Sequence, residues 1–111
     1  MTFDQARKLA LALPEAVESA HMGHPDFRVR KKIFASLPDA SRVVVKLTPE
    51  QQSIMTEAEP DIFTPIKGGW GNQGWTAVDL KAVDMVTMKS ALLTAWRNVA
   101  PKKLVATHGA K

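Results

Sequence analysis

One dense group of basic side chains in this sequence could bind phosphate. Its members, all within residues 28–32, are Arg28, Arg30, Lys31 and Lys32. Lys and Arg neutralise the phosphates of nucleic acids, and such contacts position a protein without reading base sequence. Strand alternation places Arg28 and Arg30 on the face opposite Phe27. The group is therefore either a phosphate-contacting wing or the solvated face of an edge hairpin, where basic side chains discourage aggregation.

A second candidate is the glycine-rich segment 68–75, which follows Lys67 and contains Trp70 and Trp75. Glycines can let backbone amides approach a phosphate, and indoles can stack on bases or sugars. The segment matches neither common phosphate-loop fingerprint, and it leads into a strand rather than a helix. It is therefore either a β-hairpin connection whose indoles cover one end of the sheet or a contact for nucleic acid or another ligand.

The segment 21–26 offers two imidazoles, His21 and His24, and the carboxylate of Asp26. These groups could bind a divalent metal, but no third or fourth ligand is visible at a recognisable spacing. We interpret the segment as a polar loop that enters the sheet. Because the chain has no cysteine and no nucleophile signature, we expect no catalytic residue, metal or cofactor, and no enzyme activity.

Length and charge limit the class of protein. The chain has 111 residues, which fits one domain, and 45% hydrophobic residues can line one core. The net charge is +4, and segments 27–46 and 62–111 each carry +5, which favours an anionic partner. The longest apolar run, Leu9 to Leu13, is far too short to span a membrane. With no cysteine, we expect a cytoplasmic protein. We also expect a monomer rather than an obligate oligomer.

Helix boundaries are marked by capping residues. Thr2 and Gln5 form a capping box that predicts a helix over residues 3–13, and Thr48 with Gln51 predicts another that ends at Pro60. A last helix, capped by Asp84, runs to Pro101. In this helix Trp96 is in register with the apolar stripe and is predicted to be core, whereas Trp70 in its loop is not. Residues 107–111 have no periodicity and are expected to fray.

The predicted strands follow a period of two. A hairpin begins at Phe27 and turns near Arg30-Lys31, where neither residue is the Asn or Gly of a tight turn, so we expect a longer or bulged turn. Beyond it, Ile33, Ala35 and Leu37 share one face and Phe34 lies on the other. The remaining strands are residues 42–47, an edge segment over 62–66 that contains Pro65, and residues 76–80.

The element order is α-β-β-β-α-β-β-α, with short turns between consecutive strands. This order predicts an α+β two-layer sandwich: an antiparallel sheet with helices on one face. The first and last helices have the broadest apolar stripes and should pack together on that face.

Several motifs together resemble the MmcQ/YjbR family. They are segments 24–30, 32–35, 45–47 with 49–51, 68–71, 74–75, and 95–96 with 100–102. The resemblance runs from about residue 3 to residue 105 and implies one YjbR-like domain over residues 1–106. It further implies a small sandwich like that of secretion chaperones, with DNA binding through a double-wing arrangement and no established catalytic residue. Members often have Gly where this chain has Lys31, so the hairpin tip carries more charge here.

Three classes of function remain open at this point. The first is DNA binding, for which the candidate residues are Arg28, Arg30, Lys31, Lys32, Lys67, Trp70 and Trp75. The second is a chaperone-like or adaptor role with a protein partner. The third is a small-molecule binder that uses the loop of His21 and His24. Fold analogy alone does not choose among them.

Overall fold

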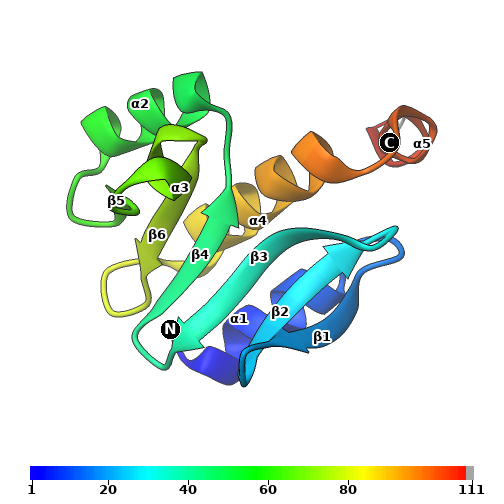
Figure 1. Ribbon diagram of the computed structural model, residues 1–111, viewed down its shortest axis with the longest axis horizontal. Coiled ribbons are helices and arrows are strands. Elements are labelled where there is room, and N and C mark those ends of the chain that lie inside the picture. The colour runs from blue at the N-terminus through cyan, green and yellow to red at the C-terminus, as the bar shows by residue number, and fades with distance from the viewer. Residues whose placement is uncertain (110–111) are drawn as a thin grey trace.

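The computed structural model describes residues 1–109, and Figure 1 shows one twisted sheet with the long helix α4 crossing behind it. Along the chain the elements are α1 (Phe3–Leu11), β1 (Val17–His21), β2 (His24–Val29), β3 (Lys32–Asp39), β4 (Arg42–Lys46), α2 (Pro49–Ala58), β5 (Phe63–Pro65), α3 (Gly69–Asn72), β6 (Trp75–Asp79), α4 (Met85–Val99) and α5 (Lys102–Gly109). Among these residues, no helix has the length and apolar character needed to cross a bilayer.

Side-chain caps fix the helix starts that the sequence predicts. Thr2 Oγ1 accepts a hydrogen bond from the Gln5 backbone N–H at 3.1 Å, and Gln5 Oε1 accepts one from the Thr2 N–H at 3.0 Å. Thr48 and Gln51 form the same reciprocal pair before α2. These bonds satisfy N–H groups that the first helical turn leaves free.

The six strands form one antiparallel sheet in the order β1-β2-β3-β4-β6-β5. Helix α4 packs on β3, β4 and α1, so α1 and α4 cover one face, and α2 packs beside β5 at the sheet edge. The structure is thus an α+β sandwich with its helices on one face, as predicted. Pro65 lies in the edge strand β5, where a residue without an N–H costs no ladder hydrogen bond.

The core lies between the helix layer and the sheet. Its largest fully buried side chains are Trp96, Phe27, Phe34, Leu37, Leu47, Leu80, Met88 and Leu92. Trp96 is completely buried and Trp70 is 64% exposed, which confirms the assignment of the two indoles. Within residues 1–109, α1 and α4 leave the opposite face of the sheet uncovered, and that face bears the site described below.

The segment 21–26 is not a loop. Strand β1, which the sequence analysis missed, pairs with β2 through a two-residue turn at Met22 and Gly23, whose φ angles are 51° and 80°. All five residues of β1 are exposed, so this edge strand has no apolar alternation to reveal it. His21 and His24 face each other across the turn as register partners.

The β2–β3 turn also differs from the prediction. It is a tight two-residue turn in which Arg30 and Lys31 both adopt positive φ, 50° and 71°. The irregularity lies farther back, where the register shifts between Phe27 and Arg28. The extra residue in β3 turns Phe34 into the core, fully buried, whereas Ile33 is only half-buried. The predicted grouping of Ile33 with the core residues of this strand is wrong.

The helices also differ from the prediction at three places. The first helix ends at Leu11 rather than at residue 13. Segment 68–75 contains the short helix α3 instead of a plain hairpin connection. Pro101 does end α4, but α5 follows it and includes residues 107–109, whose fraying stays a prediction. Residues 110 and 111 lie outside the described residues.

Candidate nucleic-acid interface and sheet groove

Antiparallel register brings the predicted interface residues to one end of the sheet. Val29 pairs with Lys32, Lys46 pairs with Trp75, and Pro65 pairs with Thr76. Strands β2, β4 and β5 therefore finish at the end where β3 and β6 begin. We call this end the basic end, and it comprises Arg30, Lys31, Lys32, Lys46, Lys67, Trp70 and Trp75. The opposite end of the strands carries Asp39, Asp61 and Asp79 with Arg42 and Lys81.

Helix α5 lies at the same end as the β2–β3 turn, at the right of Figure 1. Its His108 ring contacts the Trp96 ring with centroids 5.3 Å apart, and the Trp96 indole N–H donates to the Pro14 carbonyl. The next residue, Glu15, pairs with Arg30 of the turn. These contacts connect α5 to the β2–β3 turn. The exposed Lys102 and Lys103 of α5 therefore lie near the basic end.

Two of the predicted phosphate ligands are already paired inside the protein. Arg28 Nε and Nη2 donate to the two carboxylate oxygens of Asp26 at 2.8 and 3.0 Å. Arg30 Nε donates to Glu15 Oε1, and Arg30 Nη2 donates to Oε2 at 3.0 Å. These hydrogen bonds raise the pKa of both guanidiniums, and the Arg30 bond lowers the pKa of Glu15.

The predicted common face of Arg28 and Arg30 is therefore wrong. Arg28 extends from β2 beside Asp26, which lines the uncovered face of the sheet. Arg30 sits in the turn and is tied to Glu15, which follows helix α1 of the other layer. The positive φ of the turn breaks the alternation on which the prediction depended.

Lys31 and Lys32 are the accessible cations of the hairpin. Both residues are exposed, and neither forms a salt bridge with any residue in 1–109. They sit at and just after a tight turn, so their ammonium groups are presented at the tip of the β2–β3 hairpin.

The indoles of the basic end form a cluster with Lys46. The Trp70 and Trp75 rings meet edge to face, with centroids 6.3 Å apart and an interplanar angle of 74°. Lys46 Nζ lies 5.3 Å from the Trp75 centroid and donates to the Gln73 carbonyl at 2.9 Å. Because Trp75 is half-buried and holds Lys46, the exposed ring of Trp70 is the one free to stack on a ligand.

The glycines of segment 68–75 divide into two kinds. A Cβ on Gly71 would lie 1.7 Å from the Ile66 carbonyl oxygen, and one on Gly74 would lie 1.9 Å from that of Leu47. These two glycines permit close packing of backbone on backbone. Gly68 and Gly69 have open space at the Cβ position. Two of the four glycines in segment 68–75 are therefore explained by backbone packing rather than by a phosphate-binding role.

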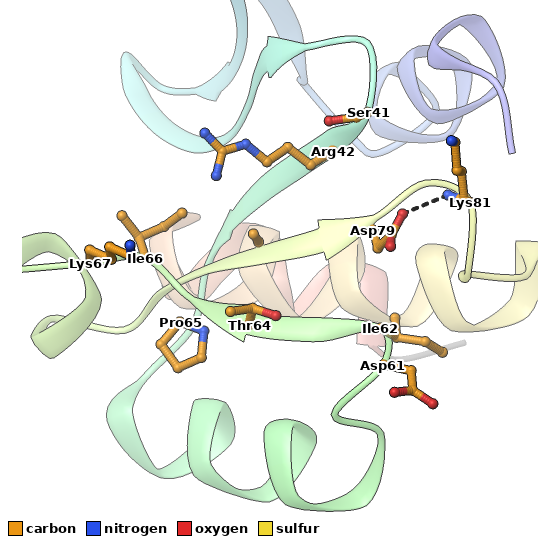
Figure 2. A pocket seen from close by; sticks show the side chains of 11 residues that line it. Ser41, Arg42, Asp61, Ile62, Thr64, Pro65, Ile66, Lys67, Asp79 and Lys81 are labelled. Atoms are coloured by element: carbon orange, nitrogen blue, oxygen red, sulfur yellow. Dashed lines mark hydrogen bonds between the residues drawn. The ribbon is translucent and has the colours of Figure 1, made fainter.

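The uncovered face of the sheet is hollowed by two adjoining cavities that share Arg42 and Ile66. The larger, about 660 Å³, lies over β4, β6 and β5; Figure 2 shows Lys67 at one end of it, Lys81 and Asp61 at the other, and Arg42 above. The smaller, about 300 Å³, reaches from His21 across the middle strands to Trp70 and Trp75. We call the two together the sheet groove.

The structure brings His21 but not His24 into this groove. Within residues 1–109 there is no group of three His, Asp or Glu side chains arranged to hold a metal ion. Asp26, the carboxylate within segment 21–26, is paired with Arg28.

Sequence reasoning missed Arg42 as a site residue. The signal was present, because alternation that puts Val43 and Val45 in the core must put Arg42 and Val44 on the other face. The face that bears Arg42 and Val44 stays uncovered because of where the helices pack. Local sequence patterns do not reveal this packing.

The architecture places the chain among α+β sandwiches with one exposed sheet face. A solved structure of the same fold is Deinococcus radiodurans protein DR2400, with a DUF419 domain. It has 21% sequence identity and a TM-score of 0.76, and the match covers 92% of this chain and 80% of that one. The sequence profile of the YjbR family matches residues 11–98. The chain belongs to the YjbR family. No curated protein matches the sequence.

Proposed function

We propose that this protein binds nucleic acid through the basic end of its sheet and catalyses no reaction. The observation that carries the proposal is the separation of charge along the strands. The accessible cations Lys31, Lys32 and Lys67 lie at the end that also bears Trp70. At the other end Asp39, Asp61 and Asp79 outnumber Arg42 and Lys81. A surface of this kind attracts a polyanion in one orientation.

The two sides of the basic end suit different parts of the ligand. The hairpin tip offers ammonium groups, which bind phosphates as point charges. The α3 connection offers the exposed face of Trp70, which suits an unstacked base. In the double-wing description of the family, the β2–β3 turn and the α3 connection would be the two wings. Contacts of these kinds carry little sequence information, so binding should depend weakly on base sequence.

Charge reversal with a matched control tests the proposal. The test variant is Lys31→Glu/Lys32→Glu, and the control is Lys81→Glu/Lys89→Glu, which changes net charge equally near the other end of the strands. Fluorescence anisotropy with labelled duplex and single-stranded oligonucleotides is measured at several salt concentrations. The test variant should lose affinity for every sequence and flatten the log–log salt slope on duplex by about 1.8, because each lost phosphate contact removes about 0.9. The control should keep its slope.

Trp70→Ala separates stacking from charge. It should weaken single-strand binding by about 1 to 3 kcal/mol and leave the salt slope unchanged. The proposal fails if the wild type shows no binding at about 100 μM protein and near-physiological salt, the upper end of the usual nonspecific range. It also fails if both charge-reversal variants lose affinity equally, because the basic end would then have no special role. A protein partner would be the remaining interpretation.

A further inference from the structure

The smaller cavity of the sheet groove has the composition of a ligand site. Its volume is about 300 Å³, and its walls are largely apolar. The apolar lining consists of Ile33, Pro38, Val44, Ile66, Trp70 and Trp75. Ligand pockets typically combine an apolar lining of this kind with a few polar groups that fix orientation. The space suits one or two fused rings rather than a chain.

One cation of this cavity is held by a single long ion pair. Arg42 Nε pairs with Asp39 Oδ2 at 3.4 Å, and within residues 1–109 this nitrogen makes no hydrogen bond. Asp39 is already engaged, because its Oδ1 accepts from the Ser41 backbone N–H at 2.8 Å and from the Ser41 hydroxyl. The Arg42 side chain is 44% exposed, and Figure 2 shows it extending from β4 toward the side of Ile66.

The cavity also contains a carboxylate, but that charge is neutralised. Asp26 is 1% exposed, and both of its oxygens accept hydrogen bonds from Arg28. The Asp26–Arg28 pair therefore contributes no net charge, and the guanidinium that lines the cavity is that of Arg42, whose Nε pairs with Asp39. One guanidinium matches a single negative charge better than a dianion.

We propose that the smaller cavity of the sheet groove binds a planar aromatic carboxylate, with its ring among the apolar residues and its carboxylate on Arg42. The planar fork of a guanidinium presents two parallel N–H donors to a carboxylate, a geometry that an ammonium cannot offer. The two indoles that line the cavity offer aromatic contacts for the ring. This site shares Trp70 and Trp75 with the basic end, but its anchor, Arg42, lies outside the proposed nucleic-acid interface.

Three small probes of one ring system test the ligand class: 1-naphthoate, the neutral 1-naphthalenemethanol and 1-naphthyl phosphate. Each is titrated into ¹⁵N-labelled protein and followed by amide chemical shifts. For a ligand of this size we expect a dissociation constant of about 0.1 to 5 mM for naphthoate. The saturable shifts should centre on Ile33, Val44 and Trp75, with the alcohol binding at least about tenfold more weakly. No saturable shift by about 10 mM, or tighter binding of the phosphate, would overturn the assignment.

Substitutions identify the anchor. Arg42→Gln keeps much of the side chain but removes the charge, and it should weaken naphthoate binding about tenfold to hundredfold. Arg42→Lys restores the charge without the fork and should recover only part of the affinity. Lys67→Gln removes a cation from the adjoining larger cavity and serves as the control. Equal losses in Arg42→Gln and Lys67→Gln would mean general charge attraction and would refute the site.

The same variants separate this inference from the proposed function. Arg42→Gln should leave oligonucleotide binding unchanged, and Lys31→Glu/Lys32→Glu should leave naphthoate binding unchanged. If oligonucleotides bind and naphthoate does not, the groove inference fails alone. If naphthoate binds and oligonucleotides do not, the nucleic-acid proposal fails alone.

Discussion

The indole N–H of Trp96 donates a hydrogen bond to the carbonyl oxygen of Pro14 at 3.0 Å, across 82 positions of the chain. Trp96 belongs to α4 and is fully buried, and Pro14 follows α1. The bond therefore joins the two helices that cover the sheet. It satisfies the one polar atom of a large core side chain, which would otherwise be costly to bury.

Replacement of Trp96 should therefore destabilise the protein far more than replacement of Trp70. We expect Trp96→Ala to lower the free energy of unfolding by about 3 to 5 kcal/mol, because it leaves a large cavity. Trp70 is exposed and makes mainly an edge contact with Trp75, so Trp70→Ala should change stability by only about 0.5 kcal/mol. Urea unfolding followed by circular dichroism measures both, and similar midpoints for the two variants would contradict the assignment.

A more conservative change keeps part of the buried ring. Trp96→Phe retains an aromatic ring but loses ring volume and leaves the Pro14 carbonyl without this donor. The same urea experiment should show an intermediate loss, about 1 to 3 kcal/mol.

The tip of the β2–β3 hairpin is a place where a substitution should stabilise the fold. Lys31 holds φ at 71°, a region that costs a residue with a Cβ about 1 kcal/mol or more and costs glycine little. Lys31→Gly should therefore raise the free energy of unfolding by about 0.5 to 1 kcal/mol. Lys31→Ala removes the same charge but keeps the Cβ, so it should give no such gain. A stability increase in both variants would point to charge repulsion instead of backbone strain.

Local sequence patterns were sufficient to predict the features that depend on residues only a few positions apart. The capping pairs Thr2–Gln5 and Thr48–Gln51 lie three residues apart, so both helix starts could be predicted. The apolar register of α4 likewise identified Trp96. The exposed edge strand β1 had no such pattern, since neither of its faces is buried.

The parts of the site that were not predicted depend on tertiary context. The turn at Arg30 and Lys31 holds positive φ without Gly or Asn, so turn chemistry misdirected the prediction. The pairing of Arg30 with Glu15 joins different layers of the sandwich. The sheet groove exists because β4 neighbours β6 and none of the helices within residues 1–109 covers their common outer face, a consequence of strand order rather than of any motif.

The surroundings of the glycines in segment 68–75 predict different effects of alanine substitution on stability at two positions. Gly74 has φ +106°, and a Cβ there would lie 1.9 Å from the Leu47 carbonyl oxygen. Gly74→Ala should therefore destabilise the protein by about 2 to 4 kcal/mol, through backbone strain and displacement of β4 from the start of β6. Gly69 has nothing within 4 Å of its Cβ position and no unusual φ, so Gly69→Ala should be close to neutral. Equal thermal midpoints for the two variants would show that the close approach is not obligatory.

The ion pair between Glu15 and Arg30 should limit the affinity of the basic end for nucleic acid. Glu15→Gln removes the carboxylate that now neutralises Arg30 and so makes one more cation available at the hairpin. If the proposed function holds, this variant should bind oligonucleotides more tightly and steepen the duplex salt slope by up to about 0.9. The control is Glu57→Gln, which makes the same charge change on exposed α2 and should leave the slope unaltered. An unchanged slope in Glu15→Gln would mean that Arg30 does not face the ligand.

The same ion pair predicts a pH dependence of stability. Its hydrogen bond to Arg30 lowers the pKa of Glu15 below the ordinary value of 4.5, so the folded state favours the ionised carboxylate. The resulting stabilisation is fully present above that ordinary value and is lost as the pH falls through the lowered pKa. Urea midpoints of the wild type and Glu15→Gln should therefore differ at about pH 7 and converge as the pH falls below 4.5 through the lowered pKa. A difference that persists undiminished at the acidic end would show that Glu15 stabilises the fold by packing instead of by charge.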